Sequence, residues 1–319
     1  MAKKKEEKKE EQKDVRFSCN VGVLSKAFRY AMAKGTMDKG VSGAVKGAYF
    51  NDCVIKIDRG IAVIRLLDQN EILYARVEFK ANSLSNGDGL MPIDLEDALK
   101  VLERIDNDSY VIVKYDGSVV SIEIERDHPR LKFVLPICPI DEIKDCISED
   151  QFKKNDNSMP EQDGIILDTK IIVEASEFKE IVKDGSQIRY LVFPFVVSKN
   201  RNEVVVSVAN EKTSKKIERE INAEIVSISP PGDDVDSIYT RGFGNAVEGL
   251  TGKLSIYLRK DGPICIEATD VGINIQYVVV GSDIKEINED LEVNLTELDE
   301  AVDGVKLEEG ESEEQDQQE

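Results

Sequence analysis

The 319-residue sequence contains one histidine, no tryptophan and five cysteines. A single imidazole excludes multi-His metal sites and most catalytic arrangements that need several of them. His128 precedes Pro129 at the start of an expected strand, which favours a surface role. The cysteines are scattered, odd in number and form no C-x-x-C pair, so we expect ordinary thiols and neither zinc sites nor disulfides. They are Cys19, Cys53, Cys138, Cys146 and Cys265.

Catalytic and nucleotide-binding motifs are also missing. The chain has no G-x-x-x-x-G-K-[ST], no H-E-x-x-H and no G-x-S-x-G. Gly242-Phe243-Gly244 lacks a third glycine at the spacing of a phosphate-binding loop. The sequence therefore predicts a protein that is not an enzyme and has no cofactor or metal. An enzyme acting on a small molecule is kept only as a distant alternative.

Long hydrophobic runs are absent as well. No stretch of about 20 apolar residues is present, and the N-terminus lacks the apolar core of a signal peptide. We therefore expect an intracellular protein with no membrane partner.

Positive charge is in short supply, with 42 Lys and Arg against 63 Asp and Glu and a net charge of −21. Residues 285–319 hold 15 of the acids and only two Lys, whereas residues 1–14 hold six Lys and five acids. The rest of the chain then carries about −9. Both ends have too few apolar residues to offset chain entropy, so we predict disordered tails over 1–14 and 285–319. An exposed basic surface for nucleic acid is disfavoured.

Between the tails, short segments rich in Val, Ile and Tyr dominate and predict mostly antiparallel sheets in an α+β fold. Helices are expected at residues 24–34, 95–105, 176–183 and 238–250, each from its apolar stripe. The last is the weakest because it contains Gly242, Gly244 and Gly249.

The same order of strands and helices occurs twice. A strand ends in Asp-Gly in each half, at Asp116-Gly117 and at Asp261-Gly262, and the next strand follows at once. The length also allows about two domains. We predict domain 1 at residues 15–136, a polar connector at 137–165 and domain 2 at 166–284.

Three segments carry a resemblance to a known family. DLEDALKVLERIDNDSYVIVKYDGSVVSIEIE, the MPEQD of the connector and KLSIYLRKDGPICIEATDVGINIQYVVV resemble sliding clamps of the proliferating cell nuclear antigen (PCNA) type, over about residues 15–284. The resemblance implies a ring of three subunits with sheets outside and helices around duplex DNA. It implies a polymerase processivity factor for DNA replication and repair, opened by an ATP-dependent clamp loader, in the cytoplasm with the nucleoid or in the nucleus.

DNA in such a ring would be encircled, so weak phosphate contacts from the helices suffice and an acidic molecule is no obstacle. Glu103, Glu180 and Glu248 depart from the family, which often has basic residues near these positions. The alternative is that the basic residues are ordinary solvated helix faces. The candidate DNA-facing residues are Lys26, Arg29, Lys34, Lys100, Arg104, Lys179, Lys183 and Arg241.

Partner proteins of the family insert a short helical turn with apolar and aromatic anchors, the PCNA-interacting (PIP) motif, into a pocket beside the connector. Most of the corresponding residues could equally be core residues, but Met159 and Pro160 lie in an otherwise polar segment. The resemblance places this pocket at Leu67, Asp68, Ile72, Met159, Pro160, Pro263, Val278, Val279 and Val280.

Subunit contacts in such rings form by pairing of edge strands. The corresponding strands are residues 129–135 and 213–221, which could also be ordinary hairpin strands. The residues expected at the interface are Arg130, Leu131, Phe133, Lys215, Ile217 and Arg219. A homotrimer is expected, and a heterotrimer is possible. Two rival functions are a subunit of a heterotrimeric or checkpoint-type clamp and a clamp-like scaffold that does not encircle DNA.

Overall fold

A computed structural model of the chain describes residues 14–33, 52–67, 73–84, 88–124, 131–137, 152–155, 158–162, 164–188, 192–198, 202–210, 215–229 and 234–281. The predicted tails lie outside these ranges except for Asp14, and the predicted connector is described only in part. Within the described ranges, no helix is long and apolar enough to cross a membrane. No group of three His, Cys, Asp or Glu in those ranges could hold a metal ion.

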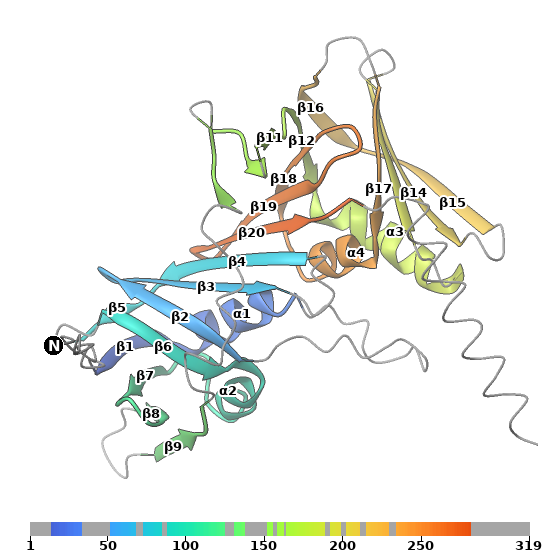
Figure 1. Ribbon diagram of the computed structural model, residues 1–319. Helices are drawn as coiled ribbons and strands as arrows, with labels where there is room; N and C mark the ends of the chain where they lie inside the picture. Colours follow the sequence, from blue (N-terminus) through green and yellow to red (C-terminus); the bar gives the residue numbers. More distant parts are fainter. Residues whose placement is uncertain are drawn as a thin grey trace, which may run out of the picture. The chain divides into compact units, whose positions relative to one another are not determined.

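The first half of the chain contains nine strands and two helices (Figure 1). They are β1 (Val15–Asn20), α1 (Val21–Ala31), β2 (Asp52–Asp58), β3 (Ile61–Leu67), β4 (Leu73–Lys80), β5 (Asn82–Ser83), β6 (Gly89–Asp94), α2 (Leu95–Leu102), β7 (Tyr110–Tyr115), β8 (Val120–Ile124) and β9 (Leu131–Leu135).

Two short strands, β10 (Glu161–Gln162) and β11 (Ile165–Ile166), form a hairpin in the connector. The order of the first half then recurs. Its elements are β12 (Thr169–Glu174), α3 (Ala175–Ile188), β13 (Val192–Ser198), β14 (Glu203–Asn210), β15 (Lys215–Ile221), β16 (Ala223–Ser227), β17 (Val235–Thr240), α4 (Arg241–Glu248), β18 (Lys253–Leu258), β19 (Ile264–Asp270) and β20 (Ile273–Val279).

Strand pairing confirms the predicted repeat. The first half has the strand order β5-β1-β7-β8-β9, and the second half has the equivalent order β16-β12-β18-β19-β20. Each half adds four strands in a second group, β4-β3-β2-β6 and β15-β14-β13-β17. All of these pairs are antiparallel. The α+β class with antiparallel sheets and two helices per repeat is therefore confirmed, while the domain boundaries at 136 and 166 stay a prediction.

One junction joins the two repeats into a nine-stranded sheet. Strand β20 of the second repeat pairs along its length with β4 of the first, with Tyr277 opposite Ala75 and Ile275 opposite Val77. The equivalents of β20 and β4 in the other repeat are β9 and β15. Within the described residues these two strands lie at sheet edges. One junction between repeats, β20–β4, is thus paired within the chain. The two strands equivalent to it, β9 and β15, are not paired with each other.

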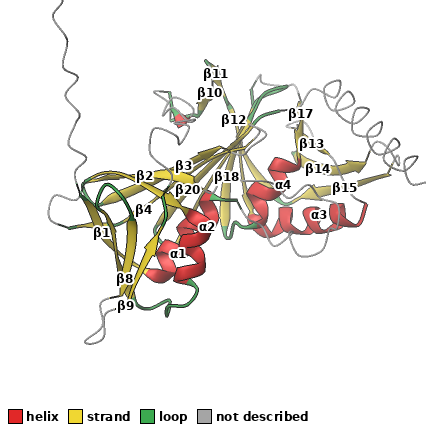
Figure 2. Cartoon of the chain, turned by 60° about the horizontal axis from the view of Figure 1, so that its bottom comes forward, coloured by secondary structure: helices red, strands yellow, loops and turns green. Residues whose placement is uncertain are grey.

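The helices lie against one face of the strands (Figure 2). α1 packs on α2, β3, β4 and β20, and α4 packs on α3, β4 and β20. Strand β4 shows why this happens, because Leu73, Ala75, Val77 and Phe79 alternate with more exposed residues and are buried on that face. The opposite face of the sheet carries the intervening polar side chains.

Helix boundaries differ from the predicted ones for local reasons. α1 begins at Val21 because Asn20 caps it, accepting a hydrogen bond from the Val23 amide at 3.1 Å. α2 begins at Leu95 as predicted, after Asp94 accepts from the Asp97 amide at 2.8 Å. α2 ends at Leu102 and α3 extends to Ile188. The predicted start of α4 at Ile238 is wrong, because Ile238 pairs with Pro194 in the sheet.

α4 forms despite its glycines because tertiary packing outweighs propensity. The ring of Phe243 makes edge contacts with Phe178 and Phe193, with ring centroids 5.3 and 5.2 Å apart. Phe195 and Tyr239 complete this buried aromatic cluster. The cluster fixes α4 beside α3, which is required for a helical surface in the second repeat.

Candidate functional surfaces

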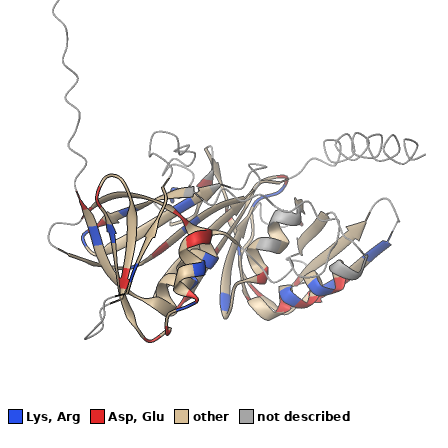
Figure 3. Ribbon diagram, turned by 90° about the horizontal axis from the view of Figure 1, so that it is seen from below, with Lys and Arg blue, Asp and Glu red and all other residues tan. Residues whose placement is uncertain are grey.

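The first candidate surface is the outward side of the four helices. Figure 3 shows Lys and Arg interleaved with Asp and Glu along α1, α2 and α3. Lys26 and Arg29 lie on α1, Lys100 on α2, and Lys179 and Lys183 on α3. Arg104 follows α2 and is exposed. Lys34 lies outside the described residues, and Arg241 opens α4 but its side chain is not described.

Carboxylates accompany the cations of the first helix pair. Arg29 donates to Glu103 across α1 and α2 at 3.1 Å, and both side chains are 58% exposed. Lys100 lies 2.8 Å from Asp97 and 3.9 Å from Glu96 on its own helix. The hydrogen bond with Asp97 raises the pKa of Lys100. Such exposed pairs contribute little to stability, so a phosphate can displace the carboxylate.

Lys26 has a second, structural partner. Its Nζ lies 3.0 Å from Asp270 at the end of β19, and the Tyr30 hydroxyl donates to the same carboxylate oxygen at 2.7 Å. Burial tends to raise the pKa of Asp270, but the hydrogen bonds from Tyr30 and Lys26 outweigh it and lower that pKa. The Tyr277 hydroxyl donates to the Tyr30 carbonyl at 2.6 Å. Lys26 therefore helps to join the two repeats.

The second helix pair is balanced in the same way. Arg219 reaches from β15 to Glu180 and Asp184 on α3, at 2.8 Å to each. The hydrogen bond with Glu180 contributes most to raising the pKa of Arg219. Among the described residues, Lys179 and Arg104 form no ion pair. The Asp97 partner could be read from its spacing to Lys100, whereas Asp270 is 244 residues from Lys26 and gave no sequence signal.

The second candidate surface lies where the connector meets β18, β19 and β20. Met159 packs, together with Tyr74 and Phe152, against a buried apolar cluster. We call this set the Met159 cluster, and its buried members are Leu167, Tyr257, Cys265 and Val278. Of the predicted pocket residues, the structure brings Met159 and Val278 together. The aromatic members were missed because Tyr74 and Tyr257 occupy ordinary strand positions and Phe152 is a single aromatic residue of the connector, with no distinguishing spacing.

Local hydrogen bonds hold Met159 in place. The Met159 amide donates to the Asn155 side chain at 2.9 Å, and the Asn155 amide donates to the Met159 carbonyl at 2.9 Å. The buried Pro160 accepts at its carbonyl from the Leu167 amide at 2.9 Å. This part of the connector is therefore a folded loop over the cluster.

Three other predicted pocket residues, Val279, Pro263 and Val280, are not members of the Met159 cluster. Val279 belongs to the main core on the opposite face of β20 because strand neighbours point to opposite faces. Pro263 is half-buried and Val280 is 38% exposed. Asp68 and Ile72 lie outside the described residues, and the Leu67 side chain is not described.

The third candidate surface consists of the two edge strands. On β9, Leu131 is 50% and Val134 is 56% exposed, while Phe133 is half-buried against the main core. On β15, Lys215 is exposed and Ile217 is half-buried. The structure thus places most predicted interface residues at sheet edges, with Arg219 turned toward α3. Arg130 lies outside the described residues.

Comparisons with known proteins show which solved structures have a similar architecture. No protein-family model and no curated protein sequence matches the chain. Among solved structures, the proliferating cellular nuclear antigen of Entamoeba histolytica is similar, with a TM-score of 0.61, 13% identity and coverage of 85% of this chain and 98% of that one.

Two further solved structures agree. A. fulgidus PCNA, bound to the C-terminal region of FEN-1, has a TM-score of 0.62, 12% identity and coverage of 84% of this chain and 98% of that one. A chain of the PCNA2–PCNA3 complex from Sulfolobus tokodaii has a TM-score of 0.59, 13% identity and coverage of 84% and 99%. The chain has the PCNA-type clamp fold, and at this identity the likeness concerns the fold.

Proposed function

We propose that the protein is a DNA sliding clamp, an intracellular ring of three copies that encircles duplex DNA and tethers a polymerase and other replication or repair enzymes. One observation carries this proposal: β9 and β15 are edges equivalent to β20 and β4, which pair within the chain. Pairing β9 of one copy with β15 of the next repeats a junction that the sequence already makes. Such head-to-tail contacts close into rings when the rotation permits.

The internal junction also supplies a register for the proposed contact. Matching β9 to β20 through β8 and β19, and β15 to β4 through β14 and β3, puts Phe133 opposite Ile217 and Lys132 opposite Glu218. The first pair is apolar and lies on the helix side of the strands. The second is an opposite-charge pair on the other face, which favours this register.

The helical surface would face the DNA in this ring. Arg29 and Lys100 pair with exposed carboxylates, which suits a clamp that must slide, because phosphates exchange readily with weakly held partners. No catalytic step is assigned to the chain. In this proposal the closed ring stays on DNA because it surrounds the duplex, so it needs little affinity for DNA.

Removing two of these carboxylates should strengthen DNA contact. We expect Glu103→Gln with Glu180→Gln to lengthen retention on duplex DNA about two- to fivefold and to steepen its salt dependence, because Arg29 loses its carboxylate partner and Arg219 keeps only Asp184, so the surface gains positive charge. Retention half-life at several salt concentrations measures this. Glu224→Gln with Asp261→Asn changes the net charge equally at exposed positions away from the helices and should have no effect. Equal effects of both variants would contradict a DNA-facing role.

Partner binding is proposed at the Met159 cluster, by analogy with the FEN-1 segment bound to A. fulgidus PCNA. Met159→Ala with Val278→Ala should weaken binding of a PIP-motif peptide about tenfold or more, since both side chains belong to the apolar contact. Isothermal titration measures the affinity. Leu90→Ala with Val226→Ala, at exposed positions outside the cluster, is the control. Met159→Ala alone is a second test that disturbs folding less. Unchanged affinity in both variants would refute the site.

A second candidate is a subunit of a mixed ring or a clamp-like scaffold that does not encircle DNA. The Sulfolobus structure contains two different clamp chains, PCNA2 and PCNA3. The carboxylates along the helices favour the scaffold. Native mass spectrometry of the purified chain separates these possibilities, because a sliding clamp of one chain type has three times the mass of a single copy.

A further inference from the structure

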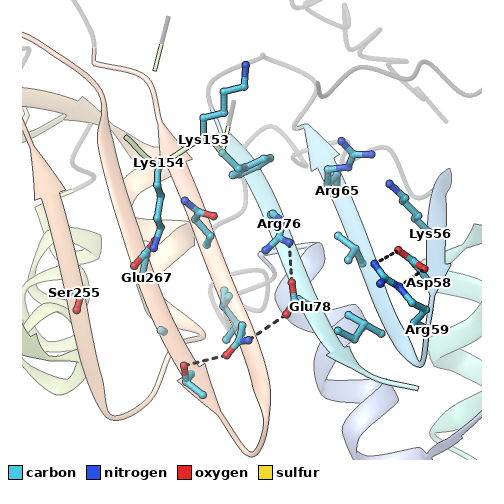
Figure 4. A pocket seen from close by; sticks show the side chains of 18 of the residues that line it. Lys56, Asp58, Arg59, Arg65, Arg76, Glu78, Lys153, Lys154, Ser255 and Glu267 are labelled. Carbon is cyan, nitrogen blue, oxygen red and sulfur yellow. Dashed lines mark hydrogen bonds and ion pairs between the residues drawn. The ribbon is translucent and has the colours of Figure 1, made fainter. Parts of the chain in front are cut away.

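A groove of about 1310 Å³ lies on the sheet face opposite the helices and adjoins the Met159 cluster (Figure 4). Its floor is formed by β2, β3 and β4 of the first repeat and β18, β19 and β20 of the second. Phe152, Lys153 and Lys154 of the connector complete it.

The groove is basic in an acidic protein. Among the described lining residues, seven are cationic and three are carboxylates, although the whole chain carries −21. The cations are Lys56, Arg59, Arg65, Arg76, Lys153, Lys154 and Lys253, and the carboxylates are Asp58, Glu78 and Glu267. Every carboxylate pairs with a lining cation: Arg59 with Asp58, Arg76 with Glu78, and Lys154 with Glu267. The groove still has an excess of positive charge.

Two arginines concentrate that charge. Arg65 on β3 and Arg76 on β4 are direct cross-strand partners on the same face. Like charges directly opposite each other in a sheet are destabilising. Glu78 lies 2.7 Å from Arg76 and offsets part of the repulsion. An arrangement of this kind favours an additional anion that both guanidinium groups can bind.

The rest of the lining indicates what carries the anion. Ile61, which is 43% exposed, and the half-buried Val63 add aliphatic surface. Phe152 is the single aromatic residue in the described lining, whereas single-stranded nucleic acid binds to rows of aromatic side chains. Mixed aliphatic and basic surface instead fits a peptide with alternating apolar and carboxylate side chains.

We propose that this groove binds an acidic peptide segment of a partner protein, with carboxylates at Lys56, Arg65 and Arg76 and aliphatic side chains over Ile61 and Val63. Phe152 lines the groove and also packs in the Met159 cluster. A partner anchored at that cluster would therefore lay its flanking residues in the groove, a link that rests on the proposed clamp function. The repulsion from the acidic surface elsewhere would confine the segment to the groove.

The test uses a short fluorescein-labelled peptide of Glu, Leu and Ser without aromatic anchors, and its counterpart with Gln for Glu. Fluorescence anisotropy with the full chain should show binding of the Glu peptide only. Lys56→Gln with Arg65→Gln should weaken it at least tenfold without lowering the Tm, because one member of the opposed arginine pair is removed. Lys153→Gln with Lys253→Gln, at two exposed positions, provides a second groove variant. Arg259→Gln with Lys260→Gln removes equal charge at two exposed positions between β18 and β19, outside the groove, and should leave binding intact.

Equal weakening by the Arg259 and Lys260 control, equal binding of the Gln peptide, or tighter binding of a single-stranded oligonucleotide of equal charge would each overturn the proposal. The two proposals fail separately. Loss of the Glu-peptide signal in the groove variants, with unchanged retention on DNA, would support the groove as a peptide site that is separate from the DNA-facing surface. Normal Glu-peptide binding by a protein that is not retained on DNA would support the groove proposal and overturn the proposed clamp function.

Discussion

Phe133→Asp is expected to convert the trimeric ring into single chains and to abolish retention on DNA. In the register taken from the β20–β4 junction, Phe133 faces Ile217 of the next copy. A carboxylate there would be buried against an apolar residue without a partner, which is strongly unfavourable. Native mass spectrometry should therefore show the mass of one chain instead of three. Leu90→Asp, at a 48% exposed position on the edge strand β6, should leave the trimer intact.

A charge exchange tests the register itself. Lys132→Glu and Glu218→Lys should each weaken the trimer, because each places like charges opposite one another. Combining them should restore it. A trimer that persists with Phe133→Asp, or single variants whose defects simply add in the double variant, would contradict this interface.

Reversing the charge of the helical surface is expected to release DNA while keeping the ring. We expect Lys100→Glu, Lys179→Glu and Lys183→Glu together to shorten retention on duplex DNA at least tenfold, since all three copies would present repulsive carboxylates to the phosphates. The salt dependence should also flatten, by up to about 0.9 in the log–log slope for each phosphate that the protein no longer neutralises. Lys26 is left out because its ion pair with Asp270 also joins the repeats.

The matched control for this reversal is Lys80→Glu, Lys253→Glu and Lys260→Glu. These three exposed lysines lie away from the four helices, and their reversal changes the net charge equally. It should leave retention nearly unchanged. If both triple variants release DNA equally, the effect reflects total charge and the helices do not face the DNA.

The repeat and its edge strands could be predicted from the sequence because their signals are local. The turns at Asp116-Gly117 and Asp261-Gly262 do join equivalent hairpins, β7–β8 and β18–β19. Asp116 accepts from the Ser118 and Val119 amides, a turn preference encoded in three residues. Alternation along β4 likewise fixes the buried face of that strand.

Boundaries and side-chain partners were harder to predict because they depend on residues far apart in the chain. Ile238 has the right spacing for a helix but belongs to β17, where it pairs with Pro194 of the distant strand β13. Arg219 could be expected at a subunit contact from its strand, yet Glu180 and Asp184 on α3 already bind it. Neighbouring valines at 278 and 279 both fitted the pocket by sequence, and only the strand register separates them.

The basic groove had no sequence signal at all. Arg65 and Arg76 each occupy an ordinary polar position in an alternating strand, and they meet only because β3 and β4 pair. Lys153 and Lys154 join them from the connector through tertiary structure. Charge counted along the chain conceals such a surface, which becomes visible only when the sheet is assembled.

Encirclement of DNA is tested most directly by the order in which protein and end blocks are added to a linear duplex. Biotinylated ends are capped with streptavidin either after or before the protein is mixed in, and the complex is then washed at high salt. A ring threaded over a free end stays trapped when capping follows, so retention is expected only in that order. Equal retention in both orders, or none in either, would contradict a clamp that encircles DNA.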